Sequence, residues 1–316
     1  MEKKNNQVLN RRNFIKTTAA ATAGLSFAPT VFSCTAKDTG STFGGVPIGV
    51  ITYSWRSMPS SAQEIINYCV SGNITSLELM GNVAEEFAGI PAGPAWPGRN
   101  ATTEEREAFM KAREEAAEKQ KNWRLNAPMD KYEELGLMFK DAGIHIHTVK
   151  FAPANWSDEE INYAFAAAKM IGAKAITNEI GDEACKRLGK FAEKHGMIAA
   201  YHNHGQPGEP GFDFEEFLAH SPANMLNLDV GHYFGATGKH PNGIIEKLHD
   251  RIYSIHLKDK TGKDSNPANT NRPWGEGETP LSDILNLIKD KKWPIYADIE
   301  LEYPVPDDSD AQQEII

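Results

Sequence analysis

Short apolar runs rich in β-branched residues alternate with amphipathic stretches from residue 46 to the end of the chain. Such runs are typical of buried strands, and their alternation with helical periodicity indicates βαβ units around a parallel sheet. The predicted strands are 48–53, 76–79, 144–151, 175–178, 197–202, 225–229, 252–256 and 294–300. The predicted helices are 62–70, 131–142, 158–171, 182–195, 213–219, 243–248 and 281–289.

Eight strands that alternate with helices predict an α/β fold, a single (β/α)₈ TIM barrel. The chain has 316 residues, which is enough for one barrel of about 250 residues and a leader. An open, doubly wound sheet is the alternative architecture. No GxGxxG turn follows the first strand, which argues against the dinucleotide-binding form of that sheet.

A long insertion, residues 82–128, follows the second predicted strand on the side where barrel active sites lie. It contains a Pro/Gly-rich segment, 91–98, and a charged helical stretch, 104–121. We expect either a lid over the site or a solvated helix that only covers one barrel end. At the other end only residues 311–316 remain for the eighth helix, so we expect that helix to be short, with one side of the barrel exposed or covered by another subunit.

The first 35 residues are typical of an export signal rather than of a folded domain. Arg11 and Arg12 precede a short, Ala/Thr-rich apolar run, the layout of a twin-arginine signal. Residues 31–34 then resemble a lipobox that ends in Cys34, whose acylation would tether the protein to a membrane. We expect a signal at 1–35, a linker at 36–45 and a barrel at 46–316, in the periplasm or as an anchored lipoprotein; a soluble secreted protein cut near Ala28 is the alternative.

Composition excludes several classes of protein. Apolar residues make up 40% and charged residues 24% of the chain, as in ordinary globular proteins. The net charge of −10 argues against nucleic acid as a partner. The cysteines, Cys34, Cys69 and Cys185, form no CxxC pair and are odd in number, so neither a disulfide framework nor a thiolate metal site is expected.

Four predicted strands in the second half of the barrel end in side chains that can bind a metal: His202, Asp229, His256 and Glu300. The first two gaps are 27 residues each, the length of about one βα unit. Because the carboxyl ends of barrel strands converge on one mouth, we expect these side chains to meet there. Two imidazoles and two carboxylates suit Mn, Zn, Co or Fe(II) better than Ca. One strand-end His or Asp alone would more often be a structural hydrogen-bonding group.

Residues two apart on a strand face the same side, so Lys258 shares the face of His256 and Glu302 that of Glu300. We predict that catalysis involves Glu300, Lys258, His204 and His202. Lys258 would act as acid, base or oxyanion stabiliser, and His204 would act likewise or only orient His202.

Other strand-end and rim residues are candidates for substrate binding. They are Glu78, His147, Trp55 and Trp274, with Tyr53 as a further aromatic near the first strand. Glu78 and His147 would bind sugar hydroxyls or be satisfied polar groups of the core. The aromatic residues would stack on a sugar ring or simply pack at the rim. Glu179, after the fourth strand, is the alternative metal or base residue if His202 is misplaced.

The strings YHNH, LDVGH, IHLKD and IELEY, in that order, resemble the sugar phosphate isomerase/epimerase superfamily with its xylose isomerase-like TIM barrel. That superfamily includes ketose 3-epimerases, inosose dehydratase and relatives of endonuclease IV. The resemblance covers residues 46–316 and implies Asp229, His256 and Glu300 as metal ligands, with His232 and Lys258 near substrate oxygens. Ketose epimerases of the family have a glutamate where this chain has His202, so the flanking carboxylate pair is lost.

Several functions follow from this chemistry. A metal at a sugar carbonyl would stabilise an enediolate, so the leading hypothesis is an exported isomerase or epimerase of a small sugar or keto-sugar. A lyase or dehydratase that eliminates from a 3-keto-sugar or keto-glycoside is the nearest alternative, because that reaction shares the proton-abstraction step. A non-catalytic, exported sugar-binding lipoprotein is the third, and a nuclease is disfavoured by the acidic charge. The sequence leaves a homo-oligomer open.

Overall fold

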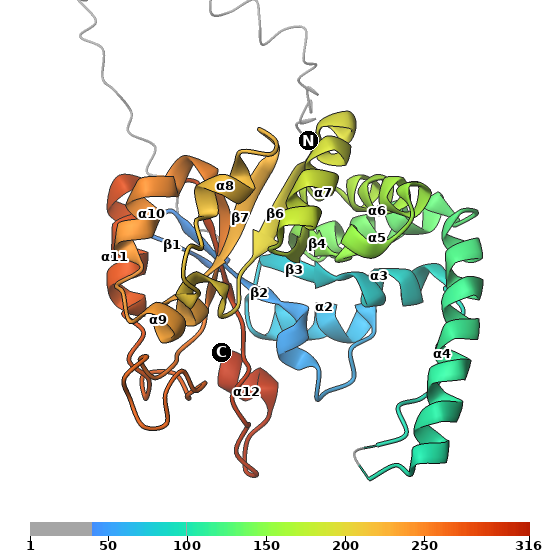
Figure 1. The fold of residues 1–316 in the computed structure, drawn as a ribbon, viewed down its shortest axis with the longest axis horizontal. Coiled ribbons are helices and arrows are strands. Elements are labelled where there is room, and N and C mark those ends of the chain that lie inside the picture. The colour runs from blue at the N-terminus through green and yellow to red at the C-terminus, as the bar shows by residue number, and fades with distance from the viewer. Residues whose placement is uncertain (1–39, 99) are drawn as a thin grey trace, which may run out of the picture. The chain divides into compact units, whose positions relative to one another are not determined.

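The computed structural model describes residues 40–98 and 100–316, in which eight parallel strands follow one another around a closed barrel (Figure 1). The barrel strands are β2 (Val46–Ile51), β3 (Ser76–Met80), β4 (His145–Lys150), β5 (Ala175–Glu179), β6 (Ile198–His202), β7 (Asn224–Asp229), β8 (Ile252–Leu257) and β9 (Tyr296–Ile299). The ring closes because β9 pairs with β2, with Gly49 opposite Asp298. The predicted (β/α)₈ barrel is confirmed, and the open sheet is wrong.

Helices connect the strands and lie outside the barrel. They are α2 (Ala62–Ser71), α3 (Gly81–Ala88), α4 (Thr103–Arg124), α5 (Met129–Asp141), α6 (Asp158–Ile171), α7 (Asp182–His195), α8 (Phe214–Leu218), α9 (Val230–Thr237), α10 (Asn242–Leu248), α11 (Leu281–Lys291) and α12 (Ala311–Ile315). The sequence pattern missed α3 and α9, which begin directly where β3 and β7 end, without a turn signal. Among the described residues, no helix combines the length and apolar character needed to cross a membrane.

Local sequence signals set where several helices begin and end. Ser61, Thr102 and Ser157 each begin a helix with a capping box, in which the hydroxyl accepts the third backbone N–H and a glutamate binds back. Gly172 and Gly196 end α6 and α7 with positive φ angles of 99° and 63°, which glycine adopts at little cost. After these glycines the chain leaves α6 and α7 and enters the parallel strands β5 and β6.

One short strand lies outside the ring. Strand β1 (Thr42–Phe43) pairs antiparallel with the start of β2, within the segment predicted to be a linker. The predicted leader, 1–35, and its Cys34 lie outside the described residues.

The barrel strands bury two kinds of surface because alternate residues point to opposite sides. Outward residues such as Leu77, Ile176 and Leu228 are fully buried in the core beneath the helices. Inside the barrel, an apolar cluster lies near the strand starts, formed by Ala175, Ala200 and Tyr253 with Ile198, Met225 and Tyr296. Above it, toward the strand ends, the interior is polar. This polar interior supports the site described below.

The insertion after β3 forms a projecting helix. None of the described residues of α4 is buried, and Figure 1 shows it at the edge of the barrel, beyond α3, α5 and α6. Its last residue, Arg124, anchors it: Nε lies 2.7 Å from Glu85 Oε1, Nη1 lies 3.1 Å from Glu160 Oε1, and the guanidinium lies over the Trp156 ring at 3.9 Å. Tyr163 also donates to Glu85.

Replacing Arg124 with methionine should lower the free energy of unfolding by about 3 kcal/mol. The change leaves Glu85 and Glu160, both largely buried, without their cation. Denaturant unfolding measures the difference. Lys131→Ala is the matched control, because its ion pair with Glu134 is exposed on both sides and should contribute little to stability. Equal losses in the two variants would show that Arg124 is not an anchor.

Candidate functional site

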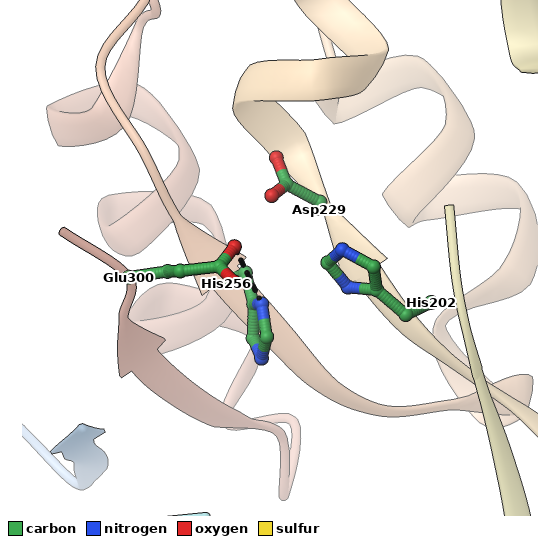
Figure 2. Close-up of side chains that lie close together, drawn as sticks. All are labelled: His202, Asp229, His256 and Glu300. Carbon is green, nitrogen blue, oxygen red and sulfur yellow. Dashed lines mark hydrogen bonds and ion pairs between the residues drawn. The ribbon is translucent and has the colours of Figure 1, made fainter. Parts of the chain in front are cut away.

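Four side chains converge at the carboxyl ends of adjacent strands β6 to β9 (Figure 2). His202 ends β6, Asp229 ends β7, His256 precedes the last residue of β8, and Glu300 follows β9. Register pairs Asp229 directly with His256. One ligand atom from each of the four lies within 4.8 Å of the others, and all four residues are buried. The structure thus brings the predicted ligands together; their role in holding a metal stays a prediction.

The chemistry of this cluster fits a divalent cation. Two imidazole nitrogens and two carboxylates form the mixed nitrogen and oxygen set that Mn, Zn, Co and Fe(II) accept. Asp229 Oδ1 accepts the backbone N–H of His232 at 2.6 Å, while the buried Oδ2 lies 3.0 Å from the ammonium of Lys258. Asp229 and Glu300 are both buried, and buried carboxylates in proteins are paired with cations or coordinate metals. The residues present therefore fit the group that the fold implies.

Lys258 supplies a resident positive charge beside this cluster. Its ammonium lies 3.0 Å from Asp229 Oδ2, 2.7 Å from Glu300 Oε2 and 2.8 Å from Glu302 Oε2, and 2.9 Å from His232 Nε2. The side chain is only 2% exposed. Burial lowers the pKa of Lys258, but the surrounding carboxylates outweigh it and raise the pKa above its ordinary value. The lysine therefore stays charged.

The electrostatics separate the two histidines. Burial lowers the pKa of His202 well below its ordinary value, with Lys150 and His256 acting in the same direction, so this imidazole is neutral. Burial opposes charge on His256 as well, but the Glu300 and Glu78 carboxylates raise its pKa well above the ordinary value. Burial raises the pKa of Glu300, but His256 and Lys258 outweigh it and lower that pKa. Glu300 and His202 thus have the protonation states that bind metal, whereas His256 has to release a proton when a metal binds.

A second polar group lies on the wall formed by β4, β5 and β6. Glu179 Oε1 lies 2.9 Å from Lys150 Nζ, and its Oε2 lies 2.9 Å from His204 Nε2. Burial raises the pKa of Glu179, but His204, His202 and Lys150 outweigh it and lower the pKa below its usual range. The hydrogen bond to Glu179 in turn raises the pKa of His204. Because β5 and β9 lie four strands apart in the ring, this pair is across the barrel from Glu300.

A cavity of about 250 Å³ lies between the two walls. Its lining consists of Ile51, Tyr53, Met80, Lys150, Glu179, His202, His204, Glu300 and Glu302. Three hollows lined by described residues are larger than this cavity: one of about 570 Å³ between α5 and α6, and two of about 730 and 390 Å³ beside α4. All three lie far from the clustered strand-end histidines. We therefore assign the site to the smaller cavity because ionisable strand-end residues line it, not because of its volume. None of the described residues of α4 lines it, so the insertion does not form a lid in this structure.

The predicted substrate-binding residues fall in different places. Glu78 and His147 are fully buried below the four-residue cluster, where His147 Nε2 lies 3.1 Å from Asp298 Oδ1. Trp55 is also fully buried, and its Nε1–H donates to Gln312 of α12. None of these three lines the cavity.

The other predicted rim residues also lie outside the cavity lining. Trp274 lies in the loop after β8, edge-on to Tyr303. His232 contacts Lys258 and stacks on His204 at 4.8 Å, so it lies nearer to the catalytic candidates. Substrate binding by all five predicted residues stays a prediction.

Sequence reasoning missed two residues that support the site. Asn227 is fully buried, and its Oδ1 lies 3.2 Å from His202 Nδ1. Lys150, at the end of β4, pairs with Glu179 and lines the cavity. Asn227 precedes Asp229 by two residues, so the same-face rule that placed Lys258 with His256 would have found it.

Comparison with known proteins agrees with the fold. The family model of the xylose isomerase-like TIM barrel matches residues 173–316. A sugar phosphate isomerase/epimerase from Parabacteroides distasonis is 16% identical with a TM-score of 0.56, covering 91% of this chain and 95% of its own. A probable 3-DHS dehydratase involved in petrobactin synthesis in Bacillus anthracis is 16% identical with a TM-score of 0.55, covering 81% of this chain and 93% of its own.

A 3-keto-D-glucoside 4-epimerase from E. coli is 11% identical with a TM-score of 0.54, covering 83% of this chain and 94% of its own. No curated protein matches the sequence. At these identities the likeness to the solved structures is one of fold. Together with the closed ring of β2 to β9, it shows that this chain folds as a TIM barrel, and residues 173–316 resemble the xylose isomerase-like form of that barrel.

Proposed function

We propose that this chain is a divalent-metal-dependent enzyme that isomerises or epimerises a small sugar or keto-sugar through an enediolate. The observation that carries the proposal is the cluster of His202, Asp229, His256 and Glu300 at one edge of a small polar cavity. The same barrel is found in a sugar phosphate isomerase/epimerase and in a 3-keto-glucoside epimerase, which supports carbohydrate as the substrate class.

The proposed site divides the work between metal and protein. A divalent cation bound there would polarise the sugar carbonyl and stabilise the charge that develops on its oxygen. Lys258 adds a buried ammonium beside the same position, held by Glu302 and Asp229. Tyr53, Ile51 and Met80 give the cavity an apolar side, against which the carbon skeleton of a sugar could pack.

Proton transfer needs a group on each wall. A base removes the proton from the carbon beside the carbonyl, and the C–H electron pair forms the enediolate. Return of a proton to the neighbouring carbon gives the isomer, and return to the opposite face gives the epimer. Glu302 with Lys258 on one wall, and His204 with Glu179 on the other, are the groups placed to carry these protons.

Elimination is the second candidate, and the His204–Glu179 pair favours it. Glu179 raises the pKa of His204, so this imidazole is held in the protonated form at higher pH. A protonated group on the wall opposite the base can donate to a leaving hydroxyl, which completes loss of water from a keto-sugar. The fold is shared with a probable dehydratase as well as with epimerases.

Export and lipid attachment remain proposals from the sequence. Residues 1–35 carry Arg11, Arg12 and the lipobox cysteine Cys34, and we propose that they direct the folded enzyme to the periplasm or anchor it there. Membrane association would come only through the acyl chain, with a small carbohydrate rather than nucleic acid as partner. A Cys34→Ala variant that still fractionates with membranes would contradict the anchor.

Removal of metal is the experiment that tests the function. We expect dialysis of the purified protein against a chelator to lower turnover of a responsive sugar or 3-keto-glycoside at least about 100-fold. Adding back Mn²⁺, Zn²⁺, Co²⁺ or Fe²⁺ should restore it, as measured by product analysis. In D₂O an isomerase or epimerase incorporates deuterium into a saturated product, whereas elimination gives an unsaturated one.

The result can contradict the proposal in two ways. Turnover that survives complete metal removal would exclude the metal-dependent mechanism. Sugar binding without turnover across the substrate panel, with or without metal, would favour a binding protein on this barrel.

A further inference from the structure

Below the four predicted ligands lies a buried carboxylate, Glu78 of β3. It contacts His256 directly and reaches His202 through the amide of Asn227. Glu78 has no exposed surface. Its Oε2 lies 2.8 Å from His256 Nε2 and accepts from Asn227 Nδ2, also at 2.8 Å. Asn227 Oδ1 in turn lies 3.2 Å from His202 Nδ1. One side chain thus reaches both imidazoles from the interior of the barrel.

The contact with His256 fixes which nitrogen faces the site. A carboxylate only accepts hydrogen bonds, so His256 Nε2 must carry the proton that Glu78 receives. The other ring nitrogen, Nδ1, lies 3.0 Å from Glu300 Oε2, on the side of the metal cluster (Figure 2). Glu300 is also a carboxylate, so Nδ1 carries a proton too in the metal-free protein. Because Glu78 keeps Nε2–H on the interior side, Nδ1 is the nitrogen that can release its proton and bind a cation.

The contact through Asn227 fixes His202 in the same way. Because Glu78 cannot donate, the amide must turn its NH₂ toward Glu78 and its oxygen toward His202. That oxygen accepts only from a protonated Nδ1. His202 Nε2 then keeps its lone pair for the site. The orientation of the Asn227 amide therefore depends on Glu78 being a carboxylate that only accepts hydrogen bonds. The tautomer of His202 depends in turn on that orientation.

We propose that Glu78 is a positioning residue that sets the tautomers of His202 and His256 and thereby presents Nε2 of one and Nδ1 of the other to the metal site. The inference rests on the proposed function in that it takes these histidines as ligands. A carboxylate or amide behind a ligating histidine fixes its ring and raises metal affinity. Here one carboxylate serves two histidines on different strands.

The matched control lies in the same buried layer. Asp298 also has no exposed surface, and its Oδ1 pairs with His147 Nε2 at 3.1 Å rather than with a predicted ligand. Glu78→Gln and Asp298→Asn each replace a buried carboxylate by the amide of the same size. Only Glu78→Gln introduces a donor into the network that orders the two histidines.

The test measures metal affinity and histidine tautomers. We expect Glu78→Gln to weaken Zn²⁺ and Co²⁺ binding about 10- to 100-fold in competition with a chromophoric chelator, and Asp298→Asn to change it less than about threefold. In long-range ¹H–¹⁵N spectra of the metal-free protein, His202 should carry its proton on Nδ1 in the wild type and in Asp298→Asn, and shift toward Nε2–H in Glu78→Gln. In the Zn²⁺ form, His256 should carry its proton on Nε2.

Other results would overturn the inference. Wild-type affinity in Glu78→Gln, or an unchanged His202 tautomer in that variant, would show that Glu78 does not position the histidines. If Glu78→Gln does not fold, Glu78→Asp, which keeps the charge but shortens the reach, should show the same loss of affinity. A wild type that binds no metal would defeat the proposed function, while the metal-free spectra would still decide the role of Glu78.

Discussion

Replacing Glu300 with glutamine should abolish measurable binding of divalent metal and lower turnover about 10³-fold or more. Glu300 follows β9 at the barrel mouth, and its Oε2 lies 3.0 Å from His256 Nδ1 and 2.7 Å from Lys258 Nζ. The substitution keeps the shape of the side chain but removes one of two anionic ligands. Loss of several kcal/mol of transition-state stabilisation corresponds to a thousandfold or more in rate.

Glu302→Gln is the control for charge alone. Glu302 lies two residues away and also contacts Lys258, at 2.8 Å, but it is 23% exposed and is no member of the four-residue cluster. We expect this variant to bind metal within about threefold of the wild type but to lose about 10²- to 10⁴-fold in turnover, because Glu302 is one of the groups proposed to carry a proton. Calorimetry with Mn²⁺ and steady-state kinetics measure the two effects. Metal binding lost equally in both variants would mean that overall charge, rather than ligation by Glu300, governs affinity.

The barrel and its mouth could be predicted because they depend on local rules. Period-2 runs and amphipathic stretches depend only on near neighbours, so all eight strands were found to within a few residues. The convergence of His202, Asp229, His256 and Glu300 then followed from topology, since parallel strands end at one mouth. Helix α9 was missed because Asp229 both ends β7 and caps the helix, which leaves no turn residue between them.

Contacts across the barrel could not be predicted in this way. Glu78 and Asn227 are 149 positions apart and meet only because β3 and β7 face each other through the interior. Trp55 looked like a rim aromatic, but the short helix α12 returns to cover it, and Gln312 accepts its indole N–H. The sequence therefore indicates which residues stand at the strand ends, while the layer beneath them depends on shear and closure of the ring.

Replacing Lys258 with methionine should move metal affinity and turnover in opposite directions. The Lys258 ammonium lies within 3.0 Å of Asp229 Oδ2 and 2.7 Å of Glu300 Oε2, the carboxylates that a cation would bind. A divalent cation and an ammonium about 4 Å apart repel by about 8 kcal/mol at an effective dielectric constant near 20. Without the ammonium we expect metal to bind at least about tenfold more tightly. Turnover should fall about 10²- to 10⁴-fold, because the acid or oxyanion stabiliser is lost.

The stability of the Lys258→Met protein independently tests whether Lys258 and a metal compete for Asp229 and Glu300. The metal-free Lys258→Met protein keeps Asp229 and Glu300 buried without their counterion, which should cost about 3 kcal/mol in the free energy of unfolding. Metal should restore most of that loss, since binding only to the folded state stabilises it. Thermal and denaturant unfolding without Mn²⁺ measures the loss of stability, and the same experiments with Mn²⁺ measure how much of it the metal restores.

Lys150→Met is the matched control for this variant. Lys150 lines the same cavity but pairs with Glu179 at 2.9 Å on the opposite wall. Its removal should raise metal affinity less than removal of Lys258, because Lys150 forms its ion pair with Glu179 rather than with Asp229 or Glu300. It should lower turnover through the His204–Glu179 pair. Weaker metal binding in Lys258→Met would mean that the ammonium holds Asp229 and Glu300 in place for the cation instead of competing with it.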